Sequence, residues 1–124
     1  MAQKAGCVTH FHTDGNIMDI ADQICEIAPN ILNPQDKANG VDNIAREFKG
    51  RMCIDLDVDR QYALPFGTPQ EIRDLVEYEI KTLGSPKGGL MMHVEARSDV
   101  PPDNLEAVVD AIETFGTYWT EKHA

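Results

Sequence analysis

The sequence has few aromatic residues, few basic residues and no long apolar run. Aromatic residues make up 6% of the 124 positions, and 11 Lys and Arg stand against 21 Asp and Glu, which gives a formal charge of −10. Because this charge repels nucleic acid backbones and anionic lipid headgroups, we expect neither as a partner. No segment approaches the ~20 apolar residues of a membrane span, and the first residues lack the apolar stretch of a signal peptide. These absences predict a soluble, cytoplasmic protein.

Cysteine and phosphate-binding glycine motifs are also scarce. Cys7, Cys25 and Cys53 are widely spaced and form no CxxC pair, which is typical of reduced thiols rather than of a zinc ribbon. The glycine-containing segment 84–89 precedes an expected strand rather than a helix, so it predicts a turn and not a phosphate loop. We find no internal repeat and no low-complexity linker, and therefore expect residues 1–124 to form a single domain.

What the sequence does contain is a regular alternation of two hydrophobic periodicities. Short β-prone runs are expected at 7–11, 30–33, 51–56 and 90–94. Apolar residues at helical spacing follow each run. They are Ile17, Ile20, Ala21, Ile24 and Ile27 in the first helix, Ile44, Ala45 and Phe48 in the second, Ile72, Leu75, Val76, Ile80 and Leu83 in the third, and Leu105, Val108, Val109, Ile112 and Phe115 in the fourth.

Helix boundaries are marked by capping residues. Asp42 is expected to cap the second helix, and Thr68, Pro69 and Glu71 form a capping-box signature at the start of the third. Four strands alternating with four helices predict an α/β fold with a parallel sheet, each strand being followed by a helix. Four such βα units amount to half of a TIM (β/α)8 barrel.

Polar residues follow all four expected strands, where the loops of a parallel α/β fold converge on a site. They are His12, Thr13, Asp14 and Asn16; Asn33, Gln35, Asp36 and Asn39; Asp55, Asp57, Asp59, Arg60 and Gln61; and His93, Glu95, Arg97 and Asp99. Some of these residues, such as Asp14 and Asp99, are equally suited to helix capping alone.

Two pairs of residues with period-two spacing stand out. Asp55 and Asp57 alternate with Leu56, so both carboxylates can face one side of a strand, where they could serve in acid–base chemistry or bind a cation. His10 and His12 form an HxH pair, which resembles the opening motif of metal-dependent amidohydrolases. The alternative interpretation of His10 is a packing role in the interior.

Five segments, in order, resemble the uroporphyrinogen decarboxylase superfamily. They are HTDGN at 12–16, ILNPQ at 31–35, IDLD at 54–57, LPFGTPQEI at 64–72 and DVPPDNL at 99–105. The resemblance spans Val8 to about Phe115. It implies that the chain is a partial domain, the C-terminal half of such a barrel, with strands five to eight.

The resemblance also implies an activity. Enzymes of this superfamily act in porphyrin biosynthesis as carboxy-lyases that remove carbon dioxide from the acetate side chains of a tetrapyrrole without a cofactor. On this interpretation the catalytic residues are Asp55, Asp57 and His93, although the family's histidine aligns with Val94, one position away. The substrate-binding residues would be His12, Asn33, Gln35, Arg60 and Arg97.

Three other interpretations remain open. Corrinoid-dependent methyltransferases of the same superfamily bind zinc through His-x-Cys, where this chain has His12–Thr13–Asp14, so a divalent metal such as zinc would be held by His12, Asp14 and Glu95. A half-barrel exposes two strand edges and one sheet face, so the chain alone would be inactive and would form a homodimer or join a complementary half-barrel. A flavodoxin-like receiver has only Asp55 and Asp57 in its favour.

Overall fold

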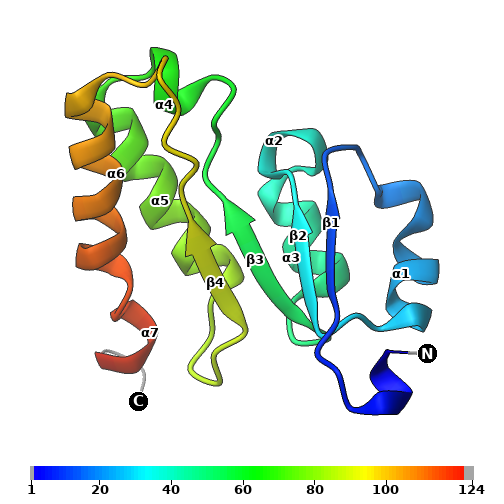
Figure 1. Ribbon diagram of the computed structural model, residues 1–124. Coiled ribbons are helices and arrows are strands. Elements are labelled where there is room, and N and C mark those ends of the chain that lie inside the picture. Colours follow the sequence, from blue (N-terminus) through cyan, green and yellow to red (C-terminus); the bar gives the residue numbers. More distant parts are fainter. Residues whose placement is uncertain (1, 122–124) are drawn as a thin grey trace.

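The strands and helices alternate along the chain and form a parallel sheet (Figure 1). The structure is a computed structural model that describes residues 2–121. Its strands are β1 (His10–Thr13), β2 (Ile31–Pro34), β3 (Cys53–Asp57) and β4 (Leu90–His93), in the order β1-β2-β3-β4 with every neighbouring pair parallel. The helices are α1 (Ala21–Ile27), α2 (Asp36–Asn39), α3 (Val41–Phe48), α4 (Ala63–Phe66), α5 (Pro69–Leu83), α6 (Pro102–Phe115) and α7 (Tyr118–Glu121), with 3-10 turns η1 (Gln3–Ala5) and η2 (Met18–Ile20). The expected α/β class with a parallel sheet is confirmed.

The helices cover the apolar face of the sheet. Leu32, Ile54 and Leu56 are fully buried, and they pack with residues of α1 and α3 in one cluster. A second cluster joins α5 and α6, with Leu90 and Met92 of β4 packed against it. Figure 1 shows α1 on one flank of the strands, α5 and α6 on the other, and α3 behind them. Because side chains alternate along a strand, the residues between these apolar positions point to the opposite face.

Several boundaries differ from those expected from the sequence. The first strand is His10–Thr13 rather than 7–11, because its parallel pairing with Ile31–Pro34 selects the residues that form the ladder. The helix capped by Asp42 instead begins at Val41, with Asp42 inside its first turn. The short helices α2 and α4, which lie in the loops after β2 and β3, lack the apolar spacing that would have marked them.

Three residues expected on apolar faces are exposed. Val109 is 50% exposed, so the structure corrects the expectation that α6 buries it. Ile20 and Ile27 are 48% and 69% exposed. Ile20 ends a 3-10 turn, which rotates successive side chains differently from an α-helix, and Ile27 is the last residue of α1. Ile17 and Ile24 alone of the four isoleucines of this segment reach the core.

The capping box at the start of α5 is confirmed in full. The Thr68 hydroxyl accepts a hydrogen bond from the Glu71 backbone N–H at 3.3 Å, and a Glu71 carboxylate oxygen accepts one from the Thr68 N–H at 2.7 Å. We expect Thr68→Ala to lower the free energy of unfolding by about 1 kcal/mol. Urea denaturation checks this, with Thr68→Ser as the control that keeps the hydroxyl. An unchanged midpoint in Thr68→Ala would show that this cap is unimportant for α5.

Candidate functional site

The strand register gathers the polar residues on the face of the sheet opposite the helices. His12 pairs with Asn33, and Asp57 pairs with His93. An isolated bridge joins Gln35 to Asp57. Residues in register on parallel strands point to the same side. The resulting polar face consists of His10, His12, Asn33, Gln35, Asp55, Asp57 and His93.

Asp55 is the centre of this polar face. Its Oδ2 lies 3.2 Å from His10 Nε2, and its Oδ1 lies 2.9 Å from His93 Nδ1. The side chain of Asp55 is 10% exposed, whereas those of the two histidines are 49% and 44% exposed. The histidine rings thus shield the carboxylate and remain open to solvent themselves. In this arrangement the two accessible imidazoles can exchange protons with a ligand, and the buried carboxylate between them stabilises the protonated ring.

Asn33 connects this centre to the neighbouring strands. Its Nδ2 donates a hydrogen bond to the backbone oxygen of Asp55 at 2.5 Å, and its Oδ1 lies 2.5 Å from His12 Nδ1. His12 Nε2 then lies 3.2 Å from Asp14 Oδ1, which also accepts a hydrogen bond from Gln35 Nε2 at 3.0 Å. The network therefore runs without a break across the polar face, and each contact fixes the orientation of the next side chain.

Arg60 closes the carboxyl end of the polar face. From the loop after β3, its guanidinium reaches Asp14 beyond β1 at 3.0 Å, Asp57 on β3 at 3.1 Å, and Glu95 beyond β4. One side chain thus ties together the loops that follow both edge strands. Four carboxylates, including that of Asp55, face this single guanidinium and three histidines, so the site is negatively charged unless the histidines are protonated.

Asp57 is the most buried acid of the site, with 3% of its surface exposed. Burial raises the pKa of its carboxyl above the ordinary value, against the opposing effects of His93 and Arg60. Its Oδ1 has no hydrogen-bond partner among the described residues, and His93 Nε2 lies 3.7 Å away, beyond hydrogen-bond range. Asp57 therefore carries a buried oxygen without a hydrogen-bond partner among the described residues, which adds to the cost of leaving this carboxyl ionised.

The residues expected to hold a metal are only partly brought together. His12 and Asp14 are in contact, while Glu95 is linked to Asp14 through Arg60. Within residues 2–121, no group of three or more His, Cys, Asp and Glu side chains is placed to hold a metal ion. Cys53, one row below Asp55 on the same face, has a thiol whose pKa is raised by burial and by the carboxylate of Asp55, which disfavours the thiolate that a metal needs.

Most of the expected site residues meet in this network, but Arg97 does not. Arg97 lies apart, more than half exposed, and its nearest ion pair is with Asp99 at 3.7 Å. His10, for which a packing role was the alternative, faces Asp55 and belongs to the site. The HxH alternation that the sequence shows places both His10 and His12 on the polar face.

A second group of acids lies behind the polar face, and sequence reasoning missed one of its members, Glu79. Glu79 of α5 is fully buried, with Asp36 and Asp59 also nearly inaccessible. Neither oxygen of Glu79 meets an N–H or O–H donor among the described residues, while its carboxyl interacts with that of Asp36. Burial, followed by the charge of Asp36, raises the pKa of Glu79 to about 10. The Asp36–Glu79 pair must therefore share a proton at neutral pH.

Asp59 has the opposite environment. Burial opposes its ionisation, but hydrogen bonds from the backbone N–H groups of Ala63, Tyr62 and Gln61 and an ion pair with Lys37 at 3.1 Å outweigh it and lower the pKa of this carboxyl. These bonds hold the turn that begins α4. Asp59 is thus a structural acid, although its position after β3 resembles that of a site residue.

Comparison with known proteins adds no relative to this description. Of the described helices, none combines the length and apolar character needed to cross a bilayer. No protein-family model matches the chain, and a search of curated proteins gives no match.

Proposed function

We propose that the chain is a (βα)4 unit of a uroporphyrinogen decarboxylase-like barrel and supplies the acid–base side of its active site. The substrate would be a tetrapyrrole carboxylate or a related pyrrole, decarboxylated without a cofactor. The observation that carries the proposal is the placement of Asp55 between His10 and His93 on the polar face. The order of the motifs HTDGN, ILNPQ, IDLD, LPFGTPQEI and DVPPDNL supports it.

The proposed reaction needs a proton donor and a stabiliser of positive charge. A proton is added to the pyrrole ring, the bond to the carboxylate carbon breaks, and its electron pair moves into the ring as carbon dioxide leaves. A second proton then converts the remaining methylene into a methyl group, and the ring carbon releases the first proton, which restores the aromatic pyrrole. His10 and His93 are accessible enough to deliver protons, and the carboxylates of Asp55 and Asp57 would stabilise the ring cation.

The charge of the site suits it to stabilise a cation rather than to bind the carboxylates of a substrate. Arg60 is already surrounded by Asp14, Asp57 and Glu95, so it offers little attraction to the carboxylates of a substrate. We infer that a pyrrole N–H of the substrate faces the carboxylate of Asp55, while the substrate's acidic side chains meet no free cation among the described residues of the site. For this reason we expect binding, rather than turnover, from the chain alone.

Porphobilinogen is a suitable probe, since this single pyrrole carries an acetate, a propionate and a cationic aminomethyl group. We expect saturable shifts of the His10 and His93 ring signals in NMR titrations of the chain. Asp55→Asn should weaken binding by about tenfold, because it removes the charge at the centre of the polar face. Glu113→Gln on the exposed side of α6 makes the same change of charge and should leave binding intact.

Two results would contradict the proposed function. One is the absence of saturable shifts on the polar face while the chain is folded by circular dichroism. The other is equal affinity in Asp55→Asn and the unmodified chain, which would place the pyrrole elsewhere.

A further inference from the structure

The two edge strands have backbone groups free to pair. Hydrogen bonds from Ile54 N to Gly89 O and from Val58 N to His93 O join β3 to alternate residues of β4. In a parallel ladder, the residues between them direct their N–H and C=O groups the other way, so those of Leu90 and Met92 point to the outer edge. The bond from Ile31 N to Thr9 O similarly leaves His10 and His12 directed away from β2.

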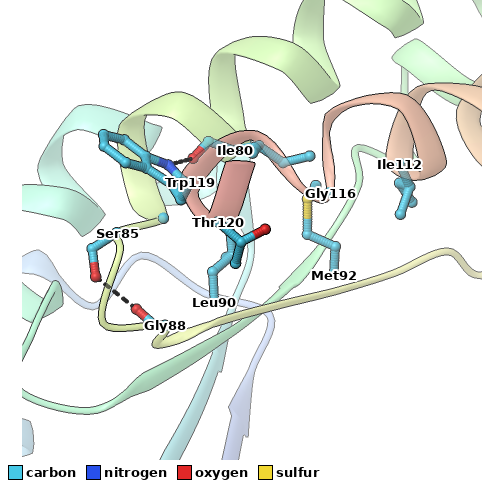
Figure 2. Close-up of a pocket in the computed structure, with 10 residues that line it drawn as sticks. Ile80, Ser85, Gly88, Leu90, Met92, Ile112, Gly116, Trp119 and Thr120 are labelled. Atoms are coloured by element: carbon cyan, nitrogen blue, oxygen red, sulfur yellow. Dashed lines mark hydrogen bonds between the residues drawn. The ribbon is translucent and has the colours of Figure 1, made fainter. Parts of the chain in front are cut away.

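An apolar hollow lies beside the free edge of β4, on the helix-covered side of the sheet. Figure 2 shows it between β4, the end of α5, and the α6–α7 segment. Its volume is about 320 Å³, and its walls include Leu90, Met92, Ile112 and Trp119. The Trp119 indole N–H donates to Ile80 O at 2.8 Å, which fixes this wall. A strand placed beside β4 would cover the hollow and direct every second side chain into it.

The free edge of β1 carries the matching feature. Phe11 points to the helix-covered side of the sheet, where it meets Ile24, Ile27 and Pro29 of the α1 region. It is nevertheless 42% exposed, whereas Leu32, its neighbour in register on β2, is fully buried. Leu32 packs with residues of both α1 and α3, which cover it from two sides. No described helix covers Phe11 from beyond the free edge of β1.

We propose that the edge of β4 binds the edge of β1 of a second copy of this chain. Two such contacts, related by a twofold axis, join two four-stranded sheets into one closed barrel of eight parallel strands. Phe11 of each copy enters the hollow beside Met92 and Ile112 of the other. Closure pairs all four free edges at once and turns both polar faces inward.

Three observations favour a second copy as the occupant. The chain itself carries both halves of the contact, the exposed Phe11 and the hollow of β4. Its four strands are half of the eight that close a side-chain-filled barrel. No described strand lies beside β1 or beside β4. Each copy can therefore pair at both edges, and no edge strand of the dimer is left unpaired. This proposal depends on the edges alone and does not rest on the function proposed above.

The negative charge of the two copies opposes the contact, so the salt dependence of dimerisation is a test of the proposal. Each copy has a formal charge of −10, so association should strengthen as salt screens the repulsion. We expect sedimentation velocity to give a mass twice the 13.8 kDa of the chain, with a dissociation constant that falls as salt is added. Amide hydrogen exchange at His10, His12, Leu90 and Met92 should slow as protein concentration rises, because these N–H groups become hydrogen-bonded in the dimer.

Phe11→Asp should raise the dimer dissociation constant by at least about tenfold, since it places a charge in an apolar hollow. Phe66→Asp is the matched control, because Phe66 is 73% exposed on α4, in the loop after β3. Both variants are checked for folding by circular dichroism and by exchange in α5. The proposal would be overturned by a folded monomer at every concentration, by open-ended oligomers, or by a dimer whose edge amides stay unprotected and that tolerates Phe11→Asp.

Discussion

Replacing Glu79 with glutamine is expected to stabilise the protein at pH 7, although the side chain is fully buried. Among the described residues, no donor is bonded to either oxygen of Glu79, and its pKa is raised to about 10 by burial and by Asp36. In the folded state the group is therefore protonated at pH 7, while in the unfolded chain it ionises near its ordinary value of 4.5. Ionisation of Glu79 in the unfolded chain favours unfolding at pH 7, and glutamine removes this effect because it does not ionise. Its amide can also donate a hydrogen bond to the carboxylate of Asp36.

The sign of the pH dependence follows from the same shift. Between pH 4.5 and about 10 the folded state holds a proton that the unfolded state releases. The stability associated with Glu79 is thus fully present below pH 4.5 and falls by about 1.4 kcal/mol per pH unit as pH rises. Over the interval to pH 7 the loss is on the order of 3 kcal/mol. Asp36 has a pKa shifted in the same direction, mainly by burial, and adds to the trend.

Urea denaturation from pH 5 to pH 8.5 tests this expectation. Glu79→Gln should have a higher midpoint at pH 7 and a flatter dependence on pH than the unmodified chain. Glu113→Gln, which makes the same substitution on an exposed part of α6, should keep the original slope. A slope that survives Glu79→Gln would mean that this carboxyl is ionised in the folded protein.

The alternation of apolar and polar residues was enough to predict the parallel sheet and to place most residues of the polar face on one side of it. Leu56 between Asp55 and Asp57 placed both acids on one face, and the structure confirms that both are there. The capping box of Thr68 and Glu71 was equally local and is also confirmed. Signals of this kind succeed because they depend only on the repeat of a strand or the geometry of one helix turn.

What could not be predicted depends on contacts between distant segments. Glu79 stands at helical spacing from Ile72 and Val76, so the repeat places it on the buried face of α5, but its contact with Asp36 arises only when α5 packs beside the segment after β2. Arg60 reaches Asp14, 46 residues away, and this contact exists only once β1 and β3 are in one sheet. Closure of the sheet into a barrel could not be predicted either, because the order of the four strands does not determine what pairs with β1 and β4.

Replacing Arg60 with alanine is expected to cause the largest loss of stability of any substitution in the site. Its guanidinium contacts Asp14, Asp57 and Glu95, and Asp57 is 3% exposed with one oxygen already lacking a partner. Removing the cation leaves a buried charge without compensation, which costs about 3 kcal/mol. It also frees the loops beyond β1 and β4, which Arg60 joins. Arg60→Lys should recover only part of the loss, because an ammonium group cannot match the spread of the planar guanidinium.

The pH dependence of this loss separates charge from packing. Without Arg60 the pKa of Asp57, already raised by burial, should rise further. Asp57 then takes up its proton at a higher pH than in the unmodified chain and, once protonated, no longer needs a cation, so the difference between Arg60→Ala and the unmodified chain should shrink as pH falls. Arg46→Ala is the control, since Arg46 is 63% exposed beside Glu47 and should cost less than about 0.5 kcal/mol. A loss that is the same at every pH would show that Arg60 acts through packing of its alkyl chain, and that Asp57 finds its counter-charge in His93.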